Sequence, residues 1–278
     1  MLFQVGELRR LGSDAPRLRF GQDEKPEGAW AGRRLMFLDD RPAYELSFPC
    51  GTCQFLFRRL AGSNDTLTVE ELRERLAGGT KELDDDVITS FGQLLERGTY
   101  LPMLLSIRPR LVAPSLAGDY FAEEQLRTWG VDSFWGLPAY PSTAYYRTFE
   151  TPVSRDAHLY EFLVPMLPPA WADPERVAAY VERLSGASVP TAVAVATLDV
   201  CAPAVAPAGS DWYEHWGLTH FLLDGHHKVQ AAAEAQRTVR VLSLLAVESS
   251  LAAPEQVARV PTLRRQRPDG RRPTAVGR

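Results

Sequence analysis

The sequence predicts an α+β fold in which a regular α/β unit in the C-terminal part packs against a second α/β region formed by residues 1–150. From about Leu159 to Glu248, short apolar runs alternate with helical patterns. Between residues 35 and 96, two strand signals are followed by helix signals. A chain of 278 residues with 45% hydrophobic content has room for one large domain or two small ones. We therefore divide it into 1–150, 151–253 and a tail, 254–278.

The N-terminal region begins its regular pattern with two candidate strands, Leu35 to Leu38 and Tyr44 to Phe48, separated by a turn signal at residues 39–42. The apolar-basic run Gln54 to Leu60 is interpreted as helical. Thr68-Val69-Glu70-Glu71 fits a capping box, in which Glu71 reaches back to the cap. A second helix is expected from about Asp84 to Glu96.

Residues 108–150 combine several prolines with many aromatic side chains and show no single period. One interpretation is a segment that wraps around the core. The other is an aromatic wall of a small-ligand pocket. The aromatic residues are Tyr120, Phe121, Trp129, Phe134, Trp135, Tyr140, Tyr145 and Tyr146.

The C-terminal unit has the clearest pattern. Asp173-Pro174-Glu175 is a strong helix start, because Asp caps the helix, Pro fits its first turn and Glu favours its positive end. The elements expected around it are a strand Leu159 to Leu167, a helix to Gly186, strands Thr191 to Val200 and Thr219 to Leu223, a helix from His227 to about Gln236, and a strand Val239 to Val247.

The tail from Pro254 loses its apolar period and gathers seven arginines. We interpret it as disordered, with a basic end that is either solvated or in contact with an acidic partner.

Composition limits the function classes. The net charge of −4 makes nucleic acid an unlikely partner, because duplex binding needs a basic face. No run approaches the ~20 apolar residues of a membrane span, and no signal-peptide pattern starts the sequence. Three cysteines, an odd number, do not resemble a secreted disulfide framework. These features predict a cytoplasmic protein.

The turn Asp224-Gly225-His226-His227-Lys228 is the strongest candidate site. Gly225 lets the backbone approach a ligand closely, and the helix that follows directs free N–H groups and its positive end at the same point. The residues 226–228 add donors and positive charge. A phosphate group is the natural ligand. The alternative is a strand-to-helix connection whose histidines only cap and pack.

Asp224 would repel a phosphate if it faced inward. Its candidate roles are to orient a histidine, to accept a substrate proton or to help hold Mg²⁺.

The order of elements together with this turn resembles the ParB/sulfiredoxin superfamily, over about ninety residues. The turn is most similar to the Asp-Gly-His-His-Arg turn of the free-serine-kinase-like branch. The resemblance implies that Gly225, His226, His227 and Lys228 bind nucleotide phosphates. His226 stands where sulfiredoxin has its reactive cysteine, so sulfinic-acid repair is not expected. No residue in 1–150 matches the kinase branch's N-terminal acidic base, and the ParB DNA-binding segment has no counterpart.

These observations lead to the first hypothesis, a nucleotide-dependent phosphotransferase that acts on a small hydroxylated metabolite with ATP or another nucleotide and Mg²⁺. Its catalytic residues would be Asp224, His226 and His227. The second hypothesis is a non-catalytic nucleotide-binding switch or partner protein that uses the same turn.

A third hypothesis is a thiol-disulfide or zinc-dependent enzyme centred on Cys50-Gly51-Thr52-Cys53. The motif resembles a thioredoxin-type redox turn, because it lies between an expected strand and an expected helix. A zinc site needs two more ligands. The candidates are Cys201, His158, His215 and His220. The alternative is a pair of buried structural cysteines.

Overall fold

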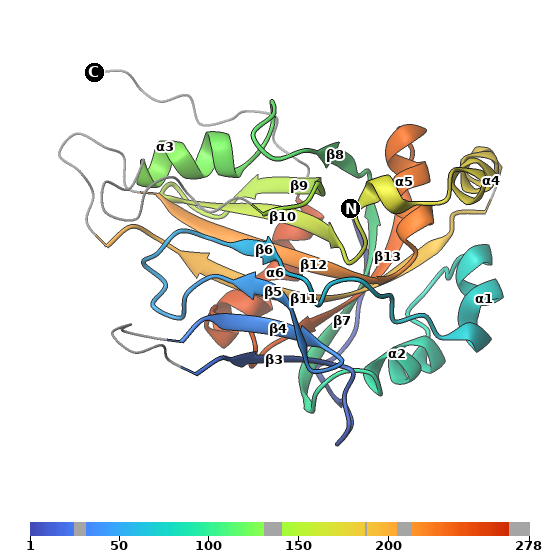
Figure 1. Cartoon of the computed structure of the whole chain (residues 1–278), viewed down its shortest axis with the longest axis horizontal. Coiled ribbons are helices and arrows are strands. Elements are labelled where there is room, and N and C mark those ends of the chain that lie inside the picture. The colour runs from blue at the N-terminus through green and yellow to red at the C-terminus, as the bar shows by residue number, and fades with distance from the viewer. Residues whose placement is uncertain (25–31, 131–140, 187, 205–212, 267–278) are drawn as a thin grey trace.

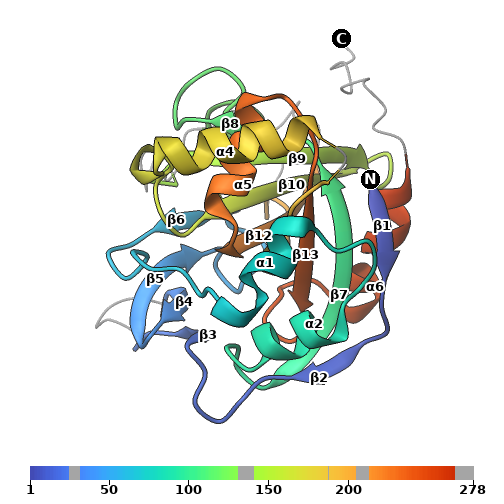
Figure 2. The same cartoon turned by 90° about the vertical axis from the view of Figure 1, so that its right-hand side faces the viewer.

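Two β-sheets form the framework, and helices complete the layers on both faces of the larger one (Figures 1 and 2). This computed structural model describes residues 1–24, 32–130, 141–186, 188–204 and 213–266. Helices coexist in it with a large mixed sheet and a second small sheet. The predicted α+β fold class is therefore confirmed.

The main sheet draws on both halves of the chain. In spatial order it contains β1 (Leu2–Val5), β7 (Gly98–Ile107), β13 (Val239–Ala246), β11 (Thr191–Cys201), β12 (Glu214–Asp224), β10 (Ala157–Pro165), β9 (Tyr145–Pro152) and β8 (Arg110–Val112), and β2 (Arg9–Leu11) also pairs with β7. The pairs β10–β12 and β11–β13 are parallel. The other pairs are antiparallel.

The smaller sheet is antiparallel and lies against one face of the main sheet. Its strands are β3 (Leu18–Gln22), β4 (Arg34–Leu38), β5 (Arg41–Leu46) and β6 (Phe57–Arg59). Its side chains share one apolar core with α1 (Arg73–Gly78) and α2 (Asp85–Gly92). A cap formed by Asp84, which accepts hydrogen bonds from Asp86 N and Val87 N, starts α2.

The opposite face of the main sheet is covered by α4 (Pro174–Ser185), α5 (His226–Glu234) and α6 (Pro254–Arg265), which share a second apolar core with it. Strand β11 shows how one strand serves both cores. Val193 and Val195 face the small-sheet side, whereas Ala192, Ala194 and Ala196 face the helices. The small alanine side chains let the helices approach the sheet closely.

The C-terminal unit follows the predicted order of elements. Strand β10, helix α4, strands β11 and β12, helix α5 and strand β13 occur in that sequence. Asp173 caps α4 as expected, because its carboxylate accepts from Glu175 N and Arg176 N. The short 3-10 helix Pro169–Trp171 precedes this cap.

Two N-terminal predictions are wrong. Residues Gln54 to Leu60 do not form a helix: they contain β6, whose pairing with β5 supplies the backbone hydrogen bonds that a helix would have made internally. Thr68 does not cap a helix. The 3-10 helix Glu70–Leu72 starts after Val69 without a side-chain cap, and the Thr68 hydroxyl donates to Asp224 instead.

The prediction that the tail is disordered from Pro254 onward is also wrong. Residues 254–265 form α6, which buries Val257, Val260 and Leu263 against the main sheet. The guanidinium of Arg264 lies 2.9 Å from the carboxylate of Glu161 on β10, and both side chains are buried. Residues 267–278 lie outside the described part of the chain.

The aromatic segment contributes to the core. Tyr120, Phe121, Tyr145 and Tyr146 are buried, whereas Trp129, at the end of α3 (Leu126–Trp129), is half-buried. A one-turn π-helix, Phe121–Gln125, leads into α3. Phe134, Trp135 and Tyr140 lie outside the described residues. The described aromatics favour the wrapping interpretation, because Tyr120, Phe121 and Tyr145 pack on the small-sheet side of the main sheet and Tyr146 packs in the core on its helix side.

The proposed boundary near residue 150 falls within β9, in a sheet that also contains β1 and β7. None of the helices in the described ranges is long and apolar enough to cross a membrane.

Candidate functional site

The turn 224–228 joins the end of β12 to the start of α5. Strands β10 and β12 are adjacent and parallel, so their carboxyl ends lie at the same edge of the main sheet. Ligands of open α/β sheets bind outside such strand ends. Gly225 adopts φ +94°, and a Cβ atom built on it would lie 2.7 Å from Ala192 Cβ. Glycine is therefore required both by the turn and by its close packing on β11.

Lys228 is buried, and its ammonium group makes two hydrogen bonds within the protein. Its Nζ atom donates to the carbonyl of Thr191 at 2.9 Å and to the carboxylate of Asp224 at 3.0 Å. Burial lowers the pKa of Lys228, while Asp224 opposes that shift. The lysine thus anchors the turn to β11 and does not extend toward a ligand.

Asp224 is held at both carboxylate oxygens. One accepts from Lys228, and the other accepts from the Thr68 hydroxyl at 3.2 Å. Because an ammonium group lies next to it, the negative charge of Asp224 is compensated within the turn. Of its candidate roles, orienting a histidine finds no support, because its hydrogen bonds within the described ranges are those with Thr68 and Lys228.

His226 fastens the turn to the loop that follows β10. Its Nε2 atom accepts from Met166 N at 3.0 Å and from Leu167 N at 3.4 Å. Burial lowers the pKa of His226 to about 4. A ring nitrogen that accepts from amides is unprotonated, so the proton of the neutral ring is on Nδ1.

His227 fastens the far end of the same loop. Its Nε2 atom accepts from Asp173 N at 3.2 Å, the residue that caps α4. Burial is the main cause of its lowered pKa, and Arg176 adds to it. The two histidines therefore hold both ends of the segment 166–173.

The structure thus corrects the expectation that the side chains of residues 226–228 give the turn a positive charge. Both imidazoles are neutral near pH 7, and the single ammonium is paired with Asp224. What the turn retains is a set of backbone donors. Within the part of the chain that the structure describes, the amides of His226, His227 and Lys228 donate no hydrogen bond, and no side chain caps the helix.

A tryptophan and an arginine lie beside the turn. Trp171 is 61% exposed and belongs to the segment held by the two histidines. The guanidinium of Arg59 lies 5.6 Å from the centroid of its ring. Arg59 also donates to Ser63 O, and the Ser63 hydroxyl donates to Met166 O at 2.8 Å. The small sheet is thus connected to the same corner.

Thr68 and Trp171 were missed by the sequence prediction. Thr68 matched a capping box, so its pattern pointed to the wrong partner. Trp171 did leave a signal: a large aromatic residue between Pro168-Pro169 and a helix cap is poorly suited to core packing.

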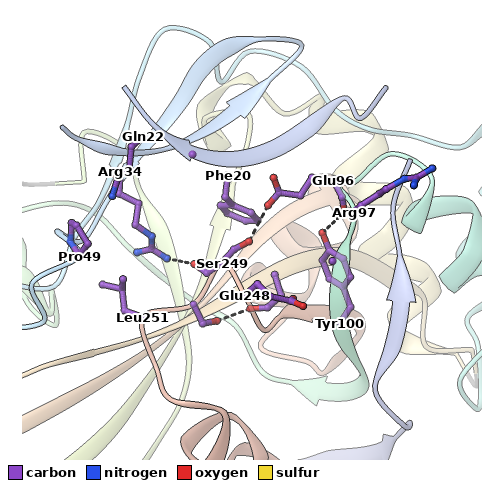
Figure 3. A pocket seen from close by; sticks show the side chains of 14 residues that line it. Phe20, Gln22, Arg34, Pro49, Glu96, Arg97, Tyr100, Glu248, Ser249 and Leu251 are labelled. Atoms are coloured by element: carbon purple, nitrogen blue, oxygen red, sulfur yellow. Dashed lines mark hydrogen bonds between the residues drawn. The ribbon is translucent and has the colours of Figure 1, made fainter. Parts of the chain in front are cut away.

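Two cavities lie away from the turn. One, of about 420 Å³, lies between β3, β7 and the segment after β13. Glu96 and Ser249 face each other at its wall, and Phe20 and Tyr100 lie close by (Figure 3). Burial is the main cause of the raised pKa of Glu96. The other, of about 720 Å³, lies between β8, β9 and the second half of α5.

The motif Cys50-Gly51-Thr52-Cys53 lies between β5 and β6, at the opposite end of β11 from the turn. Its two sulfur atoms are 2.9 Å apart. The expected zinc ligands do not assemble around them: across the described ranges, no group of three or more His, Cys, Asp or Glu side chains is arranged to hold a metal.

The remaining histidines lie on β10 and β12 and contact other side chains of the main sheet and its surroundings. His215 binds the hydroxyls of Tyr120 and Thr128. His220 binds Ser243 at 2.8 Å and faces Glu161. His158 stacks near Tyr160.

Comparison with family models, with curated proteins and with solved structures finds no match for this chain.

Proposed function

We propose that this protein is a nucleotide-dependent phosphotransferase that binds the phosphates of its nucleotide at the start of α5. The observation that carries the proposal is the trio of free amides of His226, His227 and Lys228, placed outside the carboxyl ends of two adjacent parallel strands. Free amides and the positive helix end favour an anion at this point. The resemblance of the turn to the free-serine-kinase-like branch of the ParB/sulfiredoxin superfamily supports a nucleotide as the source of that anion.

The side chains of the turn support phosphate binding, although they do not supply a net positive charge. Lys228 compensates the charge of Asp224 and the Thr68 hydroxyl holds its other oxygen, so the carboxylate near the helix start repels a phosphate less. The neutral ring of His226 keeps an Nδ1–H donor that makes no hydrogen bond within the described chain. A preorganised set of donors stabilises charge without reorganisation during the reaction.

Trp171 is our candidate platform for the nucleotide base. An exposed indole ring offers an apolar face for stacking, worth about 1–3 kcal/mol per base. Arg59 lies near the same ring and brings a cation close to the expected path of the phosphates. The histidines connect this platform rigidly to the phosphate-binding turn.

Asp224 is the proposed acceptor of the proton from the attacking hydroxyl group. It lies two residues before the first residue of α5 and is only half-buried. Phosphoryl transfer depends mainly on positioning and charge stabilisation, with a carboxylate orienting the hydroxyl. Mg²⁺ would be held through the nucleotide's phosphates with at most one or two carboxylates, as is usual for this ion.

The test starts with binding. Thermal unfolding is measured with ATP, ADP and adenosine, with and without Mg²⁺. Ligand at 100 times its Kd adds about 2.7 kcal/mol of stability, so we expect both phosphorylated ligands to raise the Tm and adenosine to have little effect. Trp171→Ala should raise the Kd for ATP roughly tenfold. Leu116→Ala, which removes another exposed apolar side chain, serves as the control. Equal stabilisation by adenosine and ATP would contradict a phosphate site.

The transfer step is tested separately with γ-labelled ATP and a mixture of small hydroxylated metabolites. Asp224→Asn should lower transfer by about 10²–10⁴-fold while ATP binding persists, because general-base catalysis contributes that much. Binding by the wild type without any turnover would reject the transferase and favour a non-catalytic nucleotide switch.

A further inference from the structure

The loop that carries Cys50 and Cys53 is fixed by its backbone. Gly51 O accepts from Ala202 N at 2.9 Å, directly after β11. Thr52 O accepts from the indole Nε1 of Trp129 at 3.3 Å. These two bonds fix the inner residues of the motif, so the cysteines at its ends are presented on a defined turn.

The two sulfur atoms are placed for disulfide formation. Cys50 Sγ and Cys53 Sγ are 2.9 Å apart. None of the three cysteines is in a disulfide. Closing the bond brings the sulfurs together by roughly 1 Å, to the usual length of about 2.05 Å. The motif is therefore ready to switch between dithiol and disulfide with little movement.

The three thiols differ in exposure. Cys50 is exposed, Cys53 is half-buried and Cys201 is buried. Burial raises the pKa of Cys50, but its hydrogen bonds with Cys53 and Thr52 outweigh burial and place that pKa below its usual value. Burial raises the pKa of Cys201 instead. Of Cys50 and Cys201, the exposed Cys50 therefore forms a thiolate more readily, and the thiolate is the nucleophilic state.

We propose that Cys50 and Cys53 form a thiol–disulfide exchange site, with Cys50 as the attacking and Cys53 as the resolving residue. The substrate is a disulfide. The Cys50 thiolate attacks one substrate sulfur, forms a mixed disulfide and releases the other substrate sulfur as a thiolate, which takes up a proton. The Cys53 thiolate then attacks Cys50 Sγ and releases the second substrate thiol. The substrate disulfide is reduced to two thiols, and the Cys50–Cys53 pair is oxidised.

A cavity adjoins this site. Pro49, the residue before Cys50, lines the cavity of about 420 Å³ (Figure 3). A small disulfide could occupy that space, whereas a protein disulfide would approach the exposed side of Cys50. Both present the same sulfur chemistry, so the test uses one substrate of each kind.

The exchange test uses the full-length protein, first reduced and freed of reductant, with glutathione disulfide and with insulin as probes. We expect the wild type to lose two of its three titratable thiols. Cys53→Ser should accumulate a stable mixed disulfide with glutathione at Cys50, identified by intact mass and peptide mapping. Cys50→Ser should react at least about tenfold more slowly than Cys53→Ser, because the remaining thiol is less exposed.

Trp129 provides a second readout. Its indole donates to the middle of the motif, so oxidation should change the fluorescence of the wild type, and this difference should be reduced in Trp129→Phe. Cys201→Ser is the matched control and should behave as the wild type in exchange, since that thiol is buried.

Three results would overturn the proposal. They are the loss of fewer than two thiols in the wild type, equal adduct formation by Cys50→Ser and Cys53→Ser, and stoichiometric zinc in the purified protein that blocks both thiols. Glutathione disulfide and insulin together distinguish a small substrate from a protein one. Cys50→Ser should keep the ATP-dependent rise in Tm. The proposal of an exchange site and the proposal of a phosphate site can therefore be refuted separately.

Discussion

The phosphate turn and the cysteine loop lie at opposite ends of β11 and β12, on the order of 30 Å apart along the strands, and they use their polar groups in opposite ways. At the turn, the ionisable side chains bind the protein itself and the backbone amides are left to bind a ligand. At the loop, backbone groups bind the protein and a side chain, Cys50, is exposed. The contrast teaches that the ionisable side chains of a motif can serve to hold it in place, while its backbone amides are the groups left to bind a ligand.

Gly225 in the turn and Gly51 in the cysteine loop, which both adopt positive φ, give the sharpest test of this contrast. Gly225→Ala should cost about 2–5 kcal/mol, the sum of left-handed strain and the 2.7 Å approach to Ala192 Cβ. Gly51→Ala should cost about 1–2 kcal/mol, because its nearest neighbour, Val200 O, is 3.5 Å away. Denaturant unfolding measures both. Gly78→Ala, with nothing within 4 Å, is the control. Equal costs at 225 and 51 would show that the turn is not tightly packed on β11.

Acid should weaken both regions through neutral histidines. Burial lowers the pKa of His226 to about 4 and that of His215, near the cysteine loop, to about 3. The unfolded chain takes up protons near pH 6.5 while these folded sites resist, so stability is present above pH 6.5 and falls as the pH drops toward 4.

The loss by pH 5 is at most roughly 2 kcal/mol per histidine. The Tm is measured between pH 4.5 and 8 for the wild type and for His226→Gln, whose curve should be flatter. A wild-type Tm that does not change over this range would contradict buried neutral imidazoles.

The two adjacent histidines should differ in importance. His226→Ala leaves two amides, Met166 N and Leu167 N, without their acceptor, and should cost about 1–3 kcal/mol. His227→Ala leaves one amide, Asp173 N, near the surface, and should cost below about 1 kcal/mol. Urea unfolding compares them. The reverse order would mean that the loop is held mainly at its α4 end.

The smallest expected effect concerns the reactivity of the Cys50 thiol and not the stability of the protein. Because its pKa is lowered, Cys50 should react with iodoacetamide with a midpoint below that of a free thiol measured under the same conditions. Rates are followed by mass spectrometry from pH 6 to 10, with Cys201 as an internal buried reference. A midpoint at or above that of a free thiol would remove the electrostatic support for Cys50 as the attacking residue.

The sequence predicted what local pattern controls. The strand and helix order between residues 157 and 246 and the cap at Asp173 follow from apolar period and side-chain capping. Strand β7 has no counterpart in the prediction, and β6 was assigned to a helix. Both depend on partner strands far along the chain, which a local pattern does not contain.

The site was predictable in position but not in roles. Gly225 and the helix start follow from the sequence, because they are local features. That the histidines accept from residues 166–173, and that Lys228 reaches Thr191, depends on segments about 40 to 60 residues away. Thr68 joins Asp224 across an even longer separation.

The pairing of Arg264 with Glu161 has a consequence for biosynthesis. Glu161 lies in the middle of β10 with no exposed side-chain surface, and the charge of Arg264 overcomes burial to hold the pKa of this carboxyl at about 2. Every strand of the main sheet precedes Arg264 in the chain. While the polypeptide emerges from the ribosome, the sheet is therefore fully synthesised before its internal counter-ion exists. A buried carboxylate without its partner costs several kcal/mol, so we expect stable closure of the sheet to require α6.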